Sequence, residues 1–410
     1  MRASPDASTL CRFCLHLLLP LVILTSAATL FGQTVSVVQT NPDQSALLSP
    51  QPAVSFVPGT GGQLAINVDD TVRYQRLEGV GASFTDSGAY LVWNKLTPAQ
   101  RSDLMQTLFG ANGIHLSYLR QPMGATDLAL SNYTYDDLPA GDTDPQMTQF
   151  SIDHDKAYII PVLQAALAAN PQIKVLALPW SPPGWMKTSG VTGGGSLNTA
   201  DFDALAKYFV KFVQAYESNG IPINYVSVQN EPLYETSGYP TMFMTSLDEG
   251  RFISQHLAPA LRAQHFHNQG WNGRPWNFNY QNANPTDATP GIFGYEHNWD
   301  NPLYPELLLR DPTVRQDLAA ISFHCYAGNV ADAQNAIHNA YPEMPIWFTE
   351  SPAATTRRTS QQIFPTWWRA MSSTCSAIGR RASRCGTWRW IRLVAPRCRM
   401  DARTAAVSSR

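Results

Sequence analysis

The chain has 410 residues, of which 44% are hydrophobic and 15% are charged. This composition excludes a disordered chain and favours one large folded domain or two of ordinary size. The formal net charge of −2 provides no global field that would favour nucleic acid or an anionic membrane as a partner.

The N-terminus has the features of a secretory signal. Arg2 and Arg12 precede an apolar run at 15–32, which has small residues near its end. Its length fits a signal peptide over residues 1–33 better than a membrane anchor, and Pro20 disfavours a spanning helix. No later segment is apolar for long enough to cross a bilayer. We therefore expect a secreted or periplasmic protein with no stable membrane span.

Two short segments are expected before the main domain. A linker rich in Pro, Ser and Gln occupies residues 34–53, and strand-like pieces at 54–76 indicate an N-terminal β segment. The main domain is expected over residues 77–355, and residues 356–410 form a tail of different composition.

The main domain alternates short β runs with longer helical patterns. The helical patterns lie at 97–110, 157–170 and 201–220, and Gly220 ends the last of them. Such alternation predicts parallel strands joined by helical crossovers, in a barrel or in an open sheet. The seven β runs span residues 77–83, 115–122, 174–181, 224–231, 291–299, 320–326 and 345–350.

Polar side chains distinguish the barrel from the open sheet. Most of the β runs end in polar or aromatic residues, and chemistry gathered at the carboxyl ends of many strands is typical of a (β/α)8 TIM barrel. Seven runs are visible where such a barrel needs eight. The strand-end residues are Arg120, Trp180, Ser181, Asn230, Glu231, Glu296, His297, His324, Tyr326 and Glu350.

The C-terminal tail has an unusual composition. Residues 351–410 contain twelve arginines, no lysine and a single acidic residue, Asp401. A basic tail that binds an anionic partner is one interpretation, but such tails rarely carry several tryptophans. We favour the hypothesis that the tail is translated out of frame and is not natively structured. An intact reading frame through codon 410 would contradict this hypothesis.

Two glutamates at strand ends predict the chemistry. Glu231 ends an apolar β run, where a carboxylate is costly unless it is solvated or paired. Glu350 follows 119 residues later, which leaves room for about three βα units and places the pair at strands 4 and 7, across the barrel mouth. Alone, either glutamate is more simply an exposed loop residue. Together they predict a glycosidase with one protonated and one ionised carboxylate, whose surroundings raise one pKa and lower the other.

The segments around this pair resemble glycoside hydrolase family 30, the glucosylceramidase-like retaining β-glycosidases. "VSVQNEP" and "IWFTES" are similar to the acid/base and nucleophile segments of that family. The resemblance runs from about residue 70 to residue 352 and implies a (β/α)8 barrel with an attached β-sandwich. The other similar segments, in chain order, are "LEGVGASFTDSGAYLV", "LRQPMGATDLALSNYTYDD", "LPWSPPGWMKTSG", "GGGSLN", "ALAKYFVKFVQAYESNGI" and "ISFHCYAG".

The resemblance implies a role for each matching residue. Glu231 corresponds to the general acid/base and Glu350 to the nucleophile. Asn230 corresponds to the asparagine that binds the sugar 2-hydroxyl, and Arg120 to an arginine that keeps the nucleophile ionised. The remaining residues assigned to substrate binding are Asp127, Trp180, His324 and Tyr326.

Three side chains of these segments also suit purely structural roles. His324 fits a core histidine on a strand about as well as it fits a sugar ligand. We expect Asp86 to cap a helix, because a capping carboxylate is commoner than a ligand at such a position. Trp185 either stacks on sugar or packs in the core, and packing is favoured.

The chain departs from the family after Glu350. The family continues to an eighth strand and then completes its β-sandwich, and neither is recognisable here, so strand 8 and most of the sandwich are expected to be missing. The expected function is hydrolysis of a β-glucoside with retention, of the glucosylceramidase type, through a glycosyl-enzyme intermediate and without a metal or an organic cofactor.

Two alternatives to this function stay open. The first is an endo-β-1,6-glucanase or xylanase of the same family, because leaving-group contacts lie on variable loops. The second is a catalytically dead, carbohydrate-binding remnant. The expected partner is in each case a β-linked glycoside, oligosaccharide or polysaccharide, and the sequence does not indicate the oligomeric state.

Overall fold

The computed structural model describes residues 77–264, Phe266 and 289–351, with short pieces between Thr34 and Thr71 and the pair Ala406–Val407. The expected signal peptide and nearly all of the tail lie outside these residues, so both stay predictions. The chain divides into two compact units. One comprises Met1–Arg73 with Pro396–Arg410, and the other Tyr74–Ala395.

The smaller unit contains two short β-ladders. β1 (Thr34–Gln39) pairs antiparallel with β2 (Ser49–Ser55), and β3 (Ala65–Ile66) pairs parallel with β11 (Ala406–Val407). The segment predicted to be a linker therefore holds one strand and most of a second. Its prolines pointed to a linker, but proline is tolerated in a strand at the edge of a sheet, and among the described residues β2 pairs with β1 alone.

Seven parallel strands form the sheet of the larger unit, and their spatial order follows the chain from β4 to β10. All five residues of β5 are buried, as expected for a parallel strand covered on both faces. Each predicted β run overlaps one of these strands, and β9 extends beyond its run at both ends. They are β4 (Gly81–Ala82), β5 (Tyr118–Pro122), β6 (Lys174–Leu178), β7 (Tyr225–Ser227), β8 (Gly291–Trp299), β9 (Leu318–Gly328) and β10 (Ile346–Glu350).

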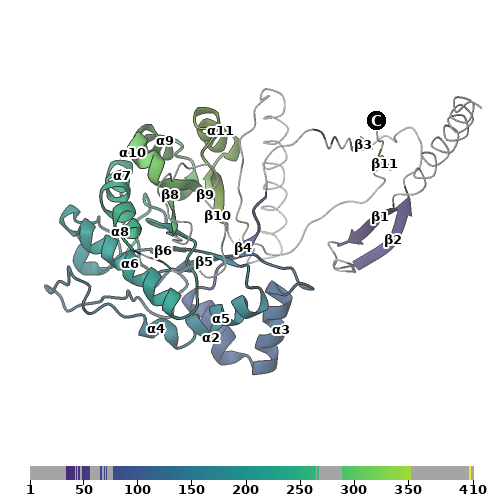
Figure 1. Ribbon diagram of the computed structural model, residues 1–410, viewed down its shortest axis with the longest axis horizontal. Coiled ribbons are helices and arrows are strands. Elements are labelled where there is room, and N and C mark those ends of the chain that lie inside the picture. Colours follow the sequence, from purple (N-terminus) through teal and green to yellow (C-terminus); the bar gives the residue numbers. More distant parts are fainter. Residues whose placement is uncertain are drawn as a thin grey trace, which may run out of the picture. The chain divides into compact units, whose positions relative to one another are not determined.

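Helices connect successive strands and lie in an arc outside them (Figure 1). Thr97 and Gln100 begin α3 with a capping box, in which each side chain bonds the backbone of the other. None of the helices in the described ranges is both long and apolar enough to cross a bilayer. The helices are α2 (Asp86–Lys95), α3 (Pro98–Phe109), α4 (Asp153–Lys156), α5 (Ile159–Ala169), η1 (Gly184–Met186), η2 (Thr199–Asp201), α6 (Phe202–Ser218), α7 (Ser246–Phe252), η3 (Ile253–Leu257), α8 (Ala258–Arg262), α9 (Leu303–Arg310), α10 (Pro312–Asp317) and α11 (Val330–Ala340).

An inner layer of the core shows that the sheet is curled into a barrel. Each strand from β5 to β10 contributes one buried side chain to this layer. The ring of Trp347 in β10 lies 5.2 Å from that of Tyr118 in β5, although four strands separate them in the sheet order. The predicted TIM-barrel fold is therefore confirmed. Among the described residues, the sheet has seven strands and no eighth strand joins β4 to β10. The six inner side chains are Tyr118, Leu176, Tyr225, Phe293, Ala320 and Trp347.

Candidate active site

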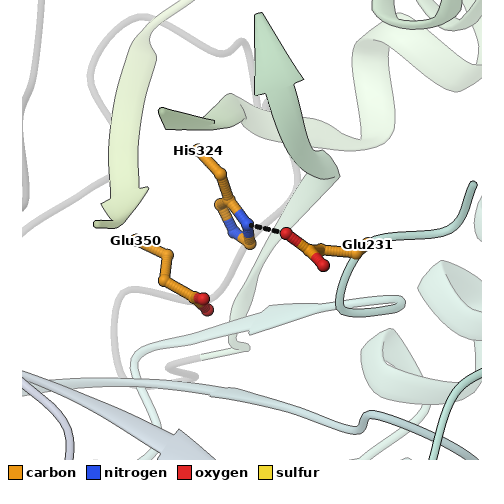
Figure 2. A group of neighbouring side chains, drawn as sticks. All are labelled: Glu231, His324 and Glu350. Carbon is orange, nitrogen blue, oxygen red and sulfur yellow. Dashed lines mark hydrogen bonds and ion pairs between the residues drawn. The ribbon is translucent and has the colours of Figure 1, made fainter. Parts of the chain in front are cut away.

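The two predicted catalytic glutamates converge at the carboxyl ends of their strands. Glu231 lies in the loop after β7, Glu350 is the last residue of β10, and His324 of β9 lies between them (Figure 2). One carboxylate oxygen of each glutamate and one ring nitrogen of His324 lie within 4.8 Å of one another. Because β7 and β10 are the fourth and seventh strands of the barrel sheet, the predicted placement of the pair is confirmed.

A strained turn positions Glu231. Its φ of 48° lies in the left-handed region, which glutamate seldom adopts. The turn is held from both sides, because the Glu231 N–H donates to the carbonyl of Glu296 at 3.0 Å and the Glu231 carbonyl accepts from Tyr234 N at 2.9 Å. Strain that is maintained by specific contacts is typical of functional sites.

Arg120 of β5 joins the nucleophile candidate to its neighbours. Its Nη1 donates to Glu350 Oε2 at 2.6 Å and its Nη2 donates to Asn230 Oδ1 at 2.7 Å. The guanidinium is buried and lies 4.9 Å from the ring centre of Trp180. Burial opposes the charge, but Glu296 and Glu350 raise the pKa of Arg120 above its already high ordinary value, so it is a permanent cation.

His324 links two carboxylates. Its Nδ1 lies 3.0 Å from Glu231 Oε1 and its Nε2 lies 3.1 Å from Glu296 Oε2. Burial by itself would lower the pKa of the imidazole, but Glu350, Glu231 and Glu296 raise it to about 9. The ring is therefore an imidazolium at neutral pH and donates from both nitrogens. A ring without a free lone pair, next to the cation of Arg120, does not fit a metal ion between the carboxylates of Glu231 and Glu350.

The acidity of Glu231 differs from the sequence prediction. A general acid was expected to have a raised pKa, and burial does act in that direction. The hydrogen bond and the positive charge of His324 outweigh burial and lower the pKa of Glu231. In the chain without substrate, the candidate acid is therefore held in its ionised form.

The remaining predicted residues surround the pair less tightly. Tyr326 is half exposed, and its hydroxyl donates to Glu350 Oε1 at 2.8 Å. Asp127 lies in the loop after β5. Desolvation and the charges of Glu350 and Glu231 raise the pKa of Asp127, which places its carboxylate within electrostatic reach of both. The predicted site residues thus gather around one position at the barrel mouth.

Comparison with known proteins identifies the barrel. Residues 77–271 match the protein family described as "Glycosyl hydrolase family 30 TIM-barrel domain". The chain belongs to glycosyl hydrolase family 30. An endo-1,6-beta-D-glucanase of Trichoderma harzianum is 33% identical over 301 residues, which cover 70% of this chain and 56% of that protein. The lysosomal acid glucosylceramidase of Mus musculus is 29% identical over 305 residues, which cover 71% of this chain and 54% of that protein.

Solved structures agree with this family 30 assignment. A solved endo-β1,6-glucanase matches with a TM-score of 0.68 at 28% identity, covering 87% of this chain and 73% of that one. The predicted resemblance to family 30 is therefore confirmed. The matches also show that the chain spans little more than half the length of its curated relatives.

Two side chains outside the catalytic pair have structural roles in this family 30 barrel. Asp86 was expected to cap α2, but Thr85 is the cap and accepts from Gly88 N at 3.3 Å. Asp86 lies in the first helical turn instead. Its side chain accepts a hydrogen bond of 2.7 Å from Leu130 N, in the loop after β5. Trp185 packs against the core and donates to Asp136 Oδ2 at 3.1 Å, in agreement with the packing interpretation.

Sequence reasoning assigned no role to Glu296 and Thr349. Both are buried, and the Thr349 hydroxyl donates to Glu296 Oε2. The sequence did mark Glu296 as a polar residue in an apolar β run. The sequence does not show that the Glu296 side chain points into the buried interior, because the direction of the side chain depends on the register of β8 against β9.

Proposed function

We propose that this chain hydrolyses β-linked glucosides with retention of configuration and that its substrate is a β-1,6-linked glucan. The observation that supports retention is the short separation of the two carboxylates, whose nearest oxygens lie within 4.8 Å. Retaining glycosidases hold their carboxyl groups about 5–5.5 Å apart, whereas inverting enzymes need roughly 6.5–9.5 Å to admit a water.

The reaction proceeds in two displacements. Glu350 attacks the anomeric carbon and forms an ester bond while the bond to the leaving oxygen breaks, and Glu231 donates its proton to that oxygen. Water then attacks the same carbon and gives a proton to Glu231, and the bond to Glu350 breaks. Both residues return to their initial protonation states.

The neighbours support these roles. Arg120 donates hydrogen bonds to both Glu350 and Asn230. One guanidinium therefore holds the nucleophile and the proposed ligand of the sugar 2-hydroxyl. Asp127 and Trp180 follow β5 and β6, on the side of the sheet where Arg120 lies, and would bind the remaining hydroxyls of the glucosyl unit.

The low pKa of Glu231 favours the second displacement, in which this residue accepts a proton. For the first displacement Glu231 must be protonated. A bound glucosyl unit removes water from the carboxylate, and loss of water raises the pKa of an acid. Substrate binding therefore prepares Glu231 for its role as an acid.

Two observations support a β-1,6-glucan substrate. Endo-1,6-beta-D-glucanases of three fungi are between 30% and 33% identical to this chain. In the loop after Glu231, the rings of Tyr234 and Tyr239 stack with their centres 6.3 Å apart and their planes at 19°. Exposed aromatic rings beside an acid/base offer an apolar surface to a second sugar unit.

A second candidate is a glucosylceramide, the substrate type of the original sequence prediction. Leu128 and Leu130 follow Asp127 in the same loop and are more than half exposed, at 57% and 56%. Apolar side chains at the edge of a sugar site suit a lipid leaving group. The glucosylceramidase relatives, at 29% identity for the Mus musculus protein, are consistent with this alternative.

A direct test uses the 410-residue chain on β-1,6-glucan, xylan, an aryl β-glucoside and a glucosylceramide. We expect turnover of β-1,6-glucan, with the β-anomer as the first product by proton NMR. Glu350→Gln should lower kcat by about 10⁴-fold or more, because the nucleophile is lost. Glu306→Gln changes a partly exposed glutamate of α9 that pairs with Arg310, and is the matched control. Unchanged activity of Glu350→Gln, or the α-anomer as the first product, would overturn the proposal. Binding without turnover would identify a carbohydrate-binding remnant.

A further inference from the structure

Glu296 lies at an irregularity in strand β8. Tyr295 pairs with Ser322 and His297 pairs with Phe323, so Glu296 is the extra residue of a β-bulge. Its φ of 55° lies in the left-handed region, like that of Tyr295 at 76°. A bulge next to an active site re-aims one side chain, and here it turns a carboxylate into the fully buried interior.

A second bulge meets the first. In β10, Phe348 pairs with Phe323 and Glu350 pairs with His324, so Thr349 is the extra residue. The Thr349 hydroxyl donates to Glu296 Oε2. The bulges of β8 and β10 thus lie on the two sides of β9 and point their side chains at one another beside His324.

The carboxylate of Glu296 lies between two cations. Its Oε2 accepts from His324 Nε2 at 3.1 Å, and its Oε1 faces Arg120 Nε at 3.5 Å. His324 Nε2 and Arg120 Nη2 are only 3.4 Å apart, which is unfavourable for two positive groups unless an anion lies beside both. Glu296 is that anion, and it contacts neither substrate position nor solvent.

The catalytic cycle makes this anion necessary. In the state that begins the first displacement, Glu231 is neutral and Glu350 is negative. In the intermediate, Glu350 is an ester and Glu231 is negative. In each of these two states the catalytic pair therefore supplies a single negative charge against the two positive charges of Arg120 and His324. Glu296 supplies the second negative charge in both states.

We propose that Glu296 is a positioning residue that keeps His324 protonated on both nitrogens, so that His324 Nδ1 donates to Glu231 throughout the cycle. This inference rests on the proposed function for the roles of Glu231 and Glu350. It extends that function by naming the buried counter-ion that controls the acid/base from a distance.

The groups that face the imidazole come from every neighbouring element. They are Arg120 from β5, Glu231 from the loop after β7, Glu296 and His297 from β8, Tyr326 from β9 and Glu350 from β10. Only Glu296 among the three carboxylates keeps its charge during the reaction. Although burial opposes its ionisation, Arg120 and His324 lower the pKa of Glu296 below its usual range.

The first test is the pH profile of kcat/KM for the full chain with Glu296→Gln. Without the counter-ion, burial acts against fewer negative charges and the pKa of His324 falls, so the cation 3.0 Å from Glu231 that favours its ionised form is weakened. The basic limb, which reports the ionisation of Glu231, should move upward by about one pH unit. Glu296→Asp retains the charge and should keep the basic limb near that of the unmodified chain.

Glu249→Gln is the matched control, because Glu249 of α7 is also a buried carboxylate and bonds Tyr295 N at 3.0 Å but does not touch His324. This control should leave the basic limb in place. A structural role for Glu296 alone would lower activity without moving the limb. An unmoved limb, or a limb moved to lower pH, would overturn the inference.

A second measurement is independent of turnover. Nitrogen NMR of the histidine-labelled chain over a pH series, with His324 assigned through a His324→Gln spectrum, should show that the imidazolium of His324 loses its proton at lower pH in Glu296→Gln than in the unmodified chain. Loss of this proton at the same pH or at a higher pH in Glu296→Gln would overturn the inference. If the unmodified chain hydrolyses none of the glycosides, the proposed function fails, and the NMR result still decides the role of Glu296.

Discussion

Two buried carboxylates of the barrel, Glu296 and Asp155, lie in contrasting surroundings. Glu296 lies between the cations Arg120 and His324, which lower its pKa despite complete burial. Asp155 of α4 accepts hydrogen bonds from three tyrosine hydroxyls, and burial raises its pKa because these bonds offset only part of the lost hydration. The donors to Asp155 are Tyr133 at 3.1 Å, Tyr135 at 2.6 Å and Tyr216 at 2.6 Å.

The difference shows what each region is built to do. Neutral hydroxyls satisfy a buried carboxylate but do not compensate its charge, whereas cations do both. The Asp155 cluster joins the loop after β5 to α4 and α6 and suits a structural role. The Glu296 cluster maintains negative charge at the strand ends, where the proposed reaction needs it.

The two regions also respond to pH with opposite sign. Asp155 has a raised folded-state pKa, so its contribution to stability is complete below the ordinary value of 3.8 and is lost as pH rises toward the folded value. Glu296 has a lowered folded-state pKa, so its contribution is present above the ordinary value of 4.5 and is lost as pH falls toward the folded value.

The strongest test of the charged region is Arg120→Met. This change leaves Glu350 and Glu296 without their shared cation, and should lower the free energy of unfolding by about 3–5 kcal/mol. It should also lower kcat/KM by about 10²–10³-fold, as expected for loss of a preorganised charge. Urea unfolding and steady-state kinetics at neutral pH measure the two effects.

Arg310→Met is the matched control, because Arg310 bonds Glu306 at 2.7 Å and is 57% exposed. Exposed ion pairs contribute about 0–1 kcal/mol, so the control should be nearly as stable as the unmodified chain. Equal losses in the two variants would show that burial of the Arg120 cluster has no special consequence.

Asp155→Asn tests the neutral region with a smaller expected effect. Replacing one acceptor oxygen by an amide group that faces a hydroxyl should destabilise the chain by about 1–3 kcal/mol at acid pH. Because Asp155 loses its contribution as pH rises above its ordinary pKa of 3.8, the destabilisation should shrink as pH rises through and beyond that value. Urea unfolding over a pH series measures the trend, and Glu296→Gln should show the reverse.

The matched control for this region is Asp153→Asn, on the same helix, where the carboxylate is exposed and pairs with Lys156 at 2.8 Å. It should show no measurable change in stability or in its pH dependence. A destabilisation by Asp155→Asn that grows with rising pH would contradict the proposed contrast between the two clusters.

Tyr326→Phe should give the smallest effect on stability. The variant removes one hydrogen bond at 2.8 Å to Glu350 from a half-exposed side chain, so the free energy of unfolding should change by less than about 0.5 kcal/mol. Loss of a bond to a charged group should still lower kcat/KM about tenfold. Tyr341→Phe, at the C-terminal end of α11 and before the start of β10, is the control for removal of a hydroxyl, and equal kinetics of both variants would exclude a role for Tyr326.

The sequence predicted the barrel strands and the placement of the two glutamates because both follow from local patterns. Seven β runs with polar ends placed Glu231 and Glu350 at strands that face each other, and the structure brings their oxygens within 4.8 Å. Periodicity and strand-end position are properties of short segments, so they can be read without knowledge of distant partners.

What the sequence could not predict depends on register and on distant contacts. Glu296 and Thr349 point inward only because bulges shift β8 and β10 against β9. Asp155 occurs in the polar stretch "DHDK", and its burial depends on tyrosines that lie 20, 22 and 61 residues away. The predicted rise in the pKa of Glu231 was likewise wrong, because the imidazolium of His324 lowers that pKa.

The peptide hydrogen bond from Glu231 N to the carbonyl of Glu296 ties the candidate acid/base to β8, in addition to the bond that Glu231 accepts from Tyr234 N in its own loop. The base of that loop is closed separately, since Met244 N bonds the carbonyl of Pro232 at 2.8 Å. Substitutions between positions 235 and 240 should therefore change the surface beside the candidate site while the backbone of Glu231 keeps its place.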